Sequence, residues 1–225
     1  MNTYAVIILV ALVGEFLLSL TAGLLNVRAM SVEVPDEFRG LYDTERYTKS
    51  QDYTRVRTRF ELVQGTVLLA VLLAFWRLGG FGWLDGAVRA QGFGPIGSGL
   101  LFVAVLMAAQ IVLGLPFRVY STFVIEERFG FNRTTMATFW ADRVKALALT
   151  VVLGGALLSA ILFFFGWAGG TAWLWCWALA TAFMLVTQFV APTWIMPLFN
   201  TFSPLGEGDL REAILGYARA VAFPL

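Results

Sequence analysis

The sequence contains no histidine and only one cysteine, and charged residues make up only 14% of its 225 residues. Histidine is the usual general base near neutral pH and the commonest zinc ligand. Without histidine, the polypeptide lacks the residues for an ordinary catalytic zinc site, a Ser-His-Asp triad or a Cys-His pair. Any chemistry in which it takes part must therefore depend on carboxylates, on a partner, or on sequence outside these residues.

Three further absences reduce the number of function classes that fit this sequence. The net charge is only +1 and no basic low-complexity tail is present, which gives no reason to expect nucleic acid as a partner. No phosphate-binding P-loop, dinucleotide fingerprint or HExxH motif occurs anywhere in the chain. The single cysteine, Cys176, lies within an apolar run and has no second cysteine with which to form an intramolecular disulfide.

What the chain has in abundance is long apolar stretches, and 59% of its residues are hydrophobic. A helix needs roughly 20 apolar residues to cross a bilayer. The sequence therefore predicts an all-α polytopic membrane protein, whose first helix is retained and not cleaved as a signal peptide. The five predicted spans are residues 4–25, 60–78, 96–115, 146–167 and 171–191.

The basic residues predict which side of the membrane each connection occupies. Of the sixteen Lys and Arg residues, seven lie in the loop 26–60, five in the loop 116–145 and two beyond residue 192. These three segments share one side by parity, and the positive-inside rule places that side in the cytoplasm. We therefore expect the N-terminus outside and a cytoplasmic tail comprising residues 192–225.

The cytoplasmic segments are expected to contain amphipathic helices. Residues 45–60 hold no Gly or Pro and predict a helix that leads into the second span. Pro192 and Pro197 should stop the fifth span near the interface. Beyond them, Asp209 is expected to cap an amphipathic helix that reaches about Phe223.

A few polar residues interrupt the predicted spans. Glu15 lies in the middle of the first, where a carboxylate costs about 2.5 kcal/mol or more unless it is paired, hydrated or protonated. Helical spacing places it on one stripe with Ser19, Ala22 and Asn26. The polar residues of the spans could line a hydrated cavity, or they could form hydrogen bonds between packed helices. The second interpretation is favoured for three glutamines. The glutamines in the other spans are Gln64, Gln110 and Gln188.

Three blocks of sequence are more specific than this periodicity. The first is Ser50-Gln-Asp-Tyr-Thr54, followed by Arg57, Arg59 and Phe60. The second is residues 123–135, with the sequence FVIEERFGFNRTT, and the third is residues 196–205, with the sequence MPLFNTFSPL. In this order and between these spans, the blocks closely resemble the type I CAAX prenyl proteases and their bacterial relatives.

The resemblance implies a zinc metalloendopeptidase built as a seven-helix membrane barrel around a water-filled chamber, with its protease domain inserted after the fifth helix. In that family two histidines of an HExxH helix and a later glutamate hold zinc. None of those residues exists in this chain, which corresponds to the N-terminal membrane region only. No catalytic or metal-binding role is therefore assigned to any residue here, and zinc is expected only in the complete protein.

The remaining candidate positions are chamber-lining or interface residues. They are Glu15, Asn26, Gln64, Gln110, Glu126, Glu127, Asn132, Gln188 and Asn200.

Two function classes remain open from the sequence. The first is the membrane part of such a protease, inactive as an isolated chain, which would contact lipid, the catalytic domain, further membrane helices and a peptide or membrane-protein substrate. The second is a separate five-helix scaffold, substrate-binding or transporter-like protein. The amphipathic tail without a partner favours the first. The membrane is expected to be a bacterial inner membrane.

Overall fold

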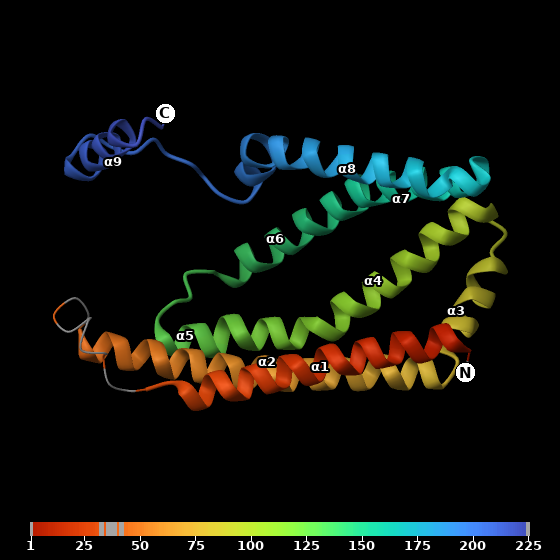
Figure 1. The fold of residues 1–225 in the computed structure, drawn as a ribbon, viewed down its shortest axis with the longest axis horizontal. Helices are drawn as coiled ribbons and strands as arrows, with labels where there is room; N and C mark the ends of the chain where they lie inside the picture. Colours follow the sequence, from red (N-terminus) through yellow and green to blue (C-terminus); the bar gives the residue numbers. More distant parts are fainter. Residues whose placement is uncertain (1, 32–33, 35–39, 41–42, 224–225) are drawn as a thin grey trace. The chain divides into compact units, whose positions relative to one another are not determined.

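The computed structural model describes residues 2–31, 34, 40 and 43–223, and all regular structure in these residues is helical (Figure 1). The fold divides into two compact units, Met1–Phe139 and Trp140–Leu225. The first unit contains α1 (Thr3–Ala29), α2 (Thr44–Arg77), α3 (Gly80–Arg89), α4 (Gly94–Tyr120) and α5 (Glu127–Phe129). Helix α6 (Met136–Leu149) begins at the boundary, and the second unit also contains α7 (Gly155–Trp167), α8 (Ala172–Val190) and α9 (Asp209–Ala220).

Five helical segments of the described chain are long and apolar enough to cross a membrane, which confirms the predicted fold class. They are Thr3–Ala29, Thr44–Arg77, Gly94–Phe129, Met136–Trp167 and Gly169–Leu198. Each contains most or all of one predicted span. Their large apolar side chains are widely exposed, as expected of helices whose solvent is lipid.

The first two helices begin at polar caps and pack against each other. The Asn2 side chain accepts a hydrogen bond from the Ala5 N–H at 2.8 Å, and Asp43 accepts one from the Glu45 N–H at 3.0 Å. Helix α2 is continuous from Thr44, so the predicted helix before the second span is confirmed. At Gly23 in α1, an added Cβ would lie 3.3 Å from a Leu62 methyl of α2, so the two backbones approach closely there.

Helix α3 was not predicted. It is a short amphipathic helix between the second and third spans, and its Leu84 and Val88, four residues apart, are both buried. Phe81 packs edge-on against Phe75 of α2, with ring centroids 5.0 Å apart. A ten-residue helix is too short to span a bilayer, so the hydropathy of the sequence did not reveal it.

The fifth predicted span ends within one residue of the expected position, but two unpredicted helical turns follow it. Helix α8 stops at Val190, but the chain continues through a π-helical turn at Ala191–Ile195 and a 3₁₀ turn at Met196–Leu198. Pro192 lacks a backbone N–H and cannot make an α-helical hydrogen bond, so it changes the hydrogen-bond pattern without ending the helical course. The α-helix therefore ends at the first proline, as predicted, and the π-helical and 3₁₀ turns that follow end just after the second.

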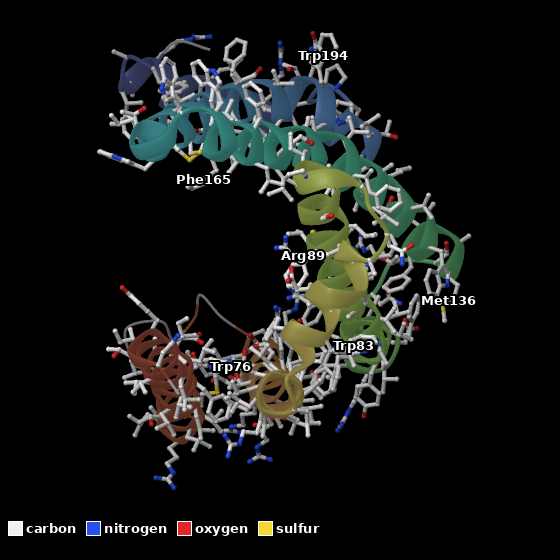
Figure 2. The ribbon with its side chains drawn as sticks, turned by 90° about the vertical axis from the view of Figure 1, so that its right-hand side faces the viewer. Trp76, Trp83, Arg89, Met136, Phe165 and Trp194 are labelled. Carbon is white, nitrogen blue, oxygen red and sulfur yellow. The ribbon has the colours of Figure 1, made fainter. Side chains whose placement is uncertain are left out.

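Helices α7 and α8 form a hairpin in the second unit. Its turn is the 3₁₀ segment Gly169–Thr171, and Ala172 just after it is 2% exposed. Aromatic rings join the two helices of the hairpin. Phe164 stacks on Trp175 with ring centroids 5.8 Å apart, and the Trp167 ring centroid lies 6.3 Å from each of theirs. Other rings, including those of Phe165 and Trp194, project outward and are exposed (Figure 2).

Helix α9 confirms the predicted amphipathic tail helix but corrects its limits. Its N-cap is Gly208, which has no side chain to cap with, and Asp209 is the first helical residue. It ends at Ala220 and not near Phe223. Asp209 instead places its charge in the first turn, where the helix dipole favours an anion.

Candidate functional site

The first motif lies on α2 and forms a polar stripe along it. Tyr53, Arg57 and Glu61 recur every four residues, which places them on one face of the helix. The Arg57 Nε–H donates to Glu61 Oε1 at 2.8 Å, and its Nη1 donates to the Tyr53 hydroxyl at 3.2 Å. The guanidinium also lies 5.9 Å from the centroid of the Tyr53 ring. The arginine is thus held between an aromatic ring and a carboxylate.

The second motif forms a tight turn after the third span. A π-helical turn at Ser121–Glu126 leads into α5. This helix is capped at its C-terminal end by Gly130, whose φ of +74° is a left-handed conformation that glycine adopts without strain. The Phe131 N–H donates to the backbone oxygen of Glu126 at 2.9 Å. The Asn132 amide donates to Glu127 Oε2 at 2.9 Å, and its oxygen accepts the Thr134 N–H at 2.7 Å.

These two motifs pack against each other through aromatic rings. The Tyr53 ring lies edge-on to Phe129 at 5.4 Å and to Phe131 at 4.8 Å between centroids. Two turns further along α2, Phe60 stacks on Tyr120 with ring centroids 5.1 Å apart. We call Tyr53, Arg57, Glu127, Phe129, Phe131 and Asn132 the motif cluster. Of these, only Glu127 and Asn132 were predicted as site residues.

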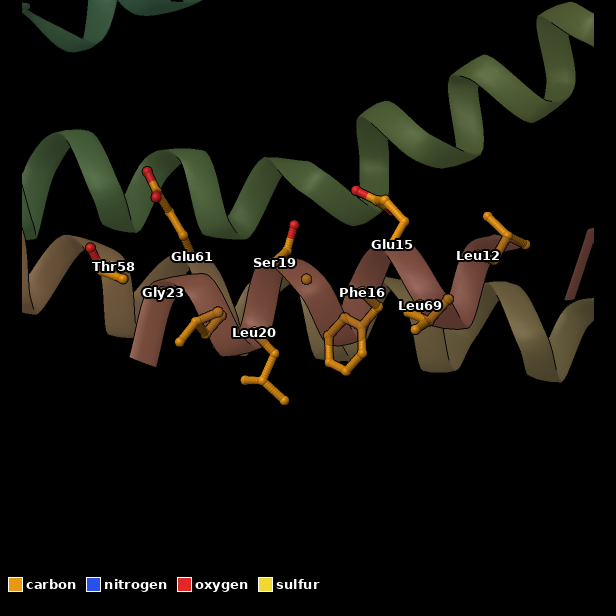
Figure 3. A pocket seen from close by; sticks show the side chains of 11 residues that line it. Leu12, Glu15, Phe16, Ser19, Leu20, Gly23, Thr58, Glu61 and Leu69 are labelled. Atoms are coloured by element: carbon orange, nitrogen blue, oxygen red, sulfur yellow. The ribbon is translucent and has the colours of Figure 1, made fainter. Parts of the chain in front are cut away.

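A second feature of the same unit is a groove between α1 and α2, with a volume of about 420 Å³. Glu15 and Ser19 line it from α1, and Thr58 and Glu61 line it from α2. Glu15, Ser19 and Glu61 project from the same side of the helix pair (Figure 3). Two residues of the predicted stripe on α1, Glu15 and Ser19, thus line this groove, whereas Asn26 does not.

The other predicted positions are not brought together. Gln64 is half-buried on α2, and Gln110 and Gln188 are exposed on α4 and α8. Within the described residues none of these amides makes a hydrogen bond, so the favoured interhelical bonding is not observed. Glu126 contributes its backbone oxygen to the turn described above.

The third motif lies in the second unit and is held by α6. Lys145 Nζ donates to the Leu198 backbone oxygen at 2.8 Å and lies 5.8 Å from the centroid of the Phe199 ring. The Asn200 N–H donates to the Met196 oxygen at 3.0 Å, which closes the turn. Lys145 is a positioning residue that the sequence reasoning missed, because its partner lies 53 residues away.

Residues 24–201, which hold the first two motifs and the start of the third, match a family described as the CAAX prenyl protease N-terminal region with five membrane helices. The chain belongs to this family. It is 37% identical over 199 residues to a CAAX prenyl protease 1 homolog of Arabidopsis thaliana, covering 85% of this chain and 47% of that protein. It is 32% identical over 208 residues to CAAX prenyl protease 1 of Saccharomyces cerevisiae, covering 86% and 45%.

The fold agrees with a solved relative. The crystal structure of S. mikatae Ste24p matches with a TM-score of 0.86 and 26% identity, covering 100% of this chain and 54% of that one. The chain thus spans about half the length of the CAAX prenyl proteases that it matches. These relatives are eukaryotic, which argues against the expected bacterial inner membrane. The chain is an integral membrane protein.

The donor set of this chain does not suit the zinc of a metalloprotease. In the part of the chain that the structure describes, no group of three or more His, Cys, Asp or Glu side chains is placed to hold a metal ion. The sequence has no histidine at all. The carboxylates that remain suit harder cations than a hydrolytic zinc site employs.

Proposed function

We propose that this chain is the membrane-embedded N-terminal part of a zinc metalloendopeptidase of the CAAX prenyl protease type, and that it forms part of the wall of an intramembrane chamber. The family match over residues 24–201, combined with a span of about half of each relative, carries this proposal. Zinc would be held by residues outside this chain. The substrate would be a peptide or membrane protein, and nucleic acid would have no part.

The contacts of the motif cluster support a structural role for this chain within such a protease, as a surface on which the catalytic domain is positioned. Its ring contacts and hydrogen bonds fix the start of α2 to the turn after the third span. Lys145 fixes the turn after the fifth span in the second unit. Both segments flank membrane spans, so we infer that each presents a rigid surface of its own unit to the catalytic domain. In this proposal Glu126, Glu127, Asn132 and Asn200 are interface positions.

The remaining candidates are proposed as chamber-lining positions. They are Glu15, Asn26, Gln64, Gln110 and Gln188.

The reading frame beyond codon 225 provides the direct test. We expect an in-frame HExxH, and we expect the longer protein to retain zinc after chelator washing and to cleave peptides. The 225-residue chain, purified in the same way, should do neither. A longer protein without HExxH and without endopeptidase activity, or a stop codon with no neighbouring gene that supplies the motif, would instead support the scaffold or transporter alternative.

The proposed topology places the N-terminus outside and residues 192–225 in the cytoplasm. It can be tested by replacing Thr3 or Gly208 with cysteine in a Cys176→Ala background, since Cys176 is the only native thiol. A membrane-impermeant thiol reagent added to intact cells should label the Thr3→Cys variant only. Labelling of the Gly208→Cys variant from outside would overturn the assignment.

A further inference from the structure

The groove between α1 and α2 has one polar side and a largely apolar lining. Its polar groups are the carboxylates of Glu15 and Glu61 and the hydroxyls of Ser19 and Thr58. A volume of about 420 Å³ falls within the range of sites that bind drug-sized ligands, roughly 300–1,000 Å³. The apolar residues that line it are Leu12, Phe16, Leu20, Leu62 and Leu69. A ligand for this groove would therefore be mainly apolar with few polar groups.

The two carboxylates of the groove differ in their charge balance. Glu61 accepts a hydrogen bond from Arg57 at 2.8 Å, so its charge is compensated within α2. Glu15 has no hydrogen bond or ion pair among the described residues, although it lies in a membrane-spanning helix. An uncompensated carboxylate in a span is costly and marks a place where a cation or a hydrogen-bond donor is needed. The described residues supply Glu15 with neither a cation nor a hydrogen-bond donor, so its carboxylate is open to a cationic ligand.

The depth of Glu15 in its helix argues against a lipid headgroup as the source of that charge. Glu15 lies midway between Thr3 and Ala29, about 18 to 21 Å from either end of α1 at 1.5 Å per residue. The ammonium of an aminolipid lies at the surface of a hydrocarbon core about 30 Å thick, and would have to move some 15 Å inward. A metal ion is also a poor fit, because no cluster of three or more ligands exists in the described residues.

We propose that the α1–α2 groove binds an apolar peptide segment carrying one lysine or arginine, whose cationic group pairs with Glu15. The hydroxyls of Ser19 and Thr58 supply further hydrogen-bonding groups beside it, and the leucines of both helices cover the apolar side chains of the peptide. This proposal rests on the proposed function in one respect: it names the class of peptide that the membrane region of the protease accepts.

The test measures peptide binding directly, without proteolysis. The purified chain in phosphatidylcholine nanodiscs is titrated with a fluorophore-labelled apolar peptide that carries one lysine, and with its twin that carries norleucine instead. We expect the lysine peptide to bind about tenfold more tightly, the effect of one added charged hydrogen bond. Glu15→Gln keeps the shape of the side chain but removes its charge. This variant should bind the lysine peptide only as tightly as the norleucine peptide.

Two glycine variants separate filling of the groove from loss of charge. Gly65 lines the groove and Gly14 does not, and a Cβ added at either position meets no atom within 4 Å. Both positions should accept leucine, which has a higher helix propensity than glycine. Gly65→Leu should weaken both peptides, and Gly14→Leu should leave both unchanged. A lysine preference that persists in Glu15→Gln, or that disappears when phosphatidylethanolamine is added to the nanodiscs, would overturn the proposal, the latter by identifying an aminolipid as the occupant.

The experiment also distinguishes this proposal from the proposed function. Glu15-dependent binding of the lysine peptide together with a longer protein that cleaves no peptide would support the groove and refute the protease. Cleavage of both peptides at equal rates, together with equal affinities for this chain, would support the protease and refute the groove.

Discussion

The α1–α2 pair and the α7–α8 hairpin are both two-helix membrane elements, but they are built from different side chains. The α1–α2 pair contains Glu15, Glu61 and Arg57, and a groove between its helices. The α7–α8 hairpin lies in a stretch with no charged residue between Lys145 and Glu207, and aromatic rings join its helices. Charge in a span persists where water, a partner or a ligand compensates it, whereas rings need only dispersion and lipid. We therefore infer that the first pair faces a polar compartment and that the face of α8 opposite Gln188 faces lipid.

The strongest way to break this comparison is to add a charge to the uncharged hairpin. Val186 on α8 is 61% exposed and lies on the opposite helix face from Gln188, and Val186→Lys should cost about 2.5–3.5 kcal/mol of membrane insertion. Glu15→Lys exchanges one charge for another in α1 and should change insertion far less. A glycosylation-based insertion assay of the two helices measures both. Equal losses would show that α1 tolerates charge no better than α8.

Removing the ring that joins the first two motifs should have the next largest effect. Tyr53→Ala removes two edge-on ring pairs, each contributing roughly 0.5–1.5 kcal/mol, and should destabilise the chain by about 1–3 kcal/mol in detergent. Tyr53→Phe should retain most of this stability, because it loses only the hydroxyl that accepts from Arg57. Tyr217→Ala, at an exposed ring of α9, is the matched control. Similar unfolding of all three variants would contradict the packing role.

Lys145 tests the second unit in the same way. Lys145→Met should free the Leu198 oxygen at a cost of about 1 kcal/mol, since the ammonium is partly exposed and its bond is weakened by solvent. Hydrogen exchange at the Phe199 and Asn200 amides should then be about fivefold faster. Unchanged exchange at these amides would show that the turn is stable without the Lys145 hydrogen bond. Arg211→Met in α9 is the control for loss of a positive surface charge.

The smallest expected effect concerns the contact between α1 and α2. Gly23→Ala gains helix propensity, but its Cβ presses on Leu62 at 3.3 Å, whereas Gly14→Ala gains the same propensity with no contact. Gly14→Ala should therefore be the more stable variant by about 0.5 kcal/mol. Chemical denaturation in detergent can compare the two. A more stable Gly23→Ala would show that the helices are not closely packed at this position.

The parts of the fold that the sequence predicted are those set by the bilayer. Its thickness fixes the length of a span, so five apolar runs predict five helices whatever their neighbours are. Helix α3 escaped prediction because its buried Leu84 and Val88 give only a short local pattern. The turns after α8 escaped prediction because Pro192 can be accommodated in a π-helical turn as well as at a helix end.

The candidate site was predicted less well, for a physical reason. Glu15 was identified from its charge alone, since a carboxylate in an apolar run needs an explanation. The contact of Tyr53 with Phe129 and Phe131 joins segments more than 70 residues apart, and local pattern carries no information on such pairs. Only the family resemblance marked these segments as special, and it did not say which of their residues touch.

The most direct test of the central claim measures water access to the two helix pairs in one chain. In a Cys176→Ala background, Ser19→Cys in the α1–α2 groove and Val186→Cys on α8 would be treated in membranes with a small hydrophilic thiol reagent. Because the groove is inferred to face a polar compartment, the cysteine at position 19 should react and the one at position 186 should not. Equal reactivity, or reaction at position 186 alone, would contradict the assignment of the two faces.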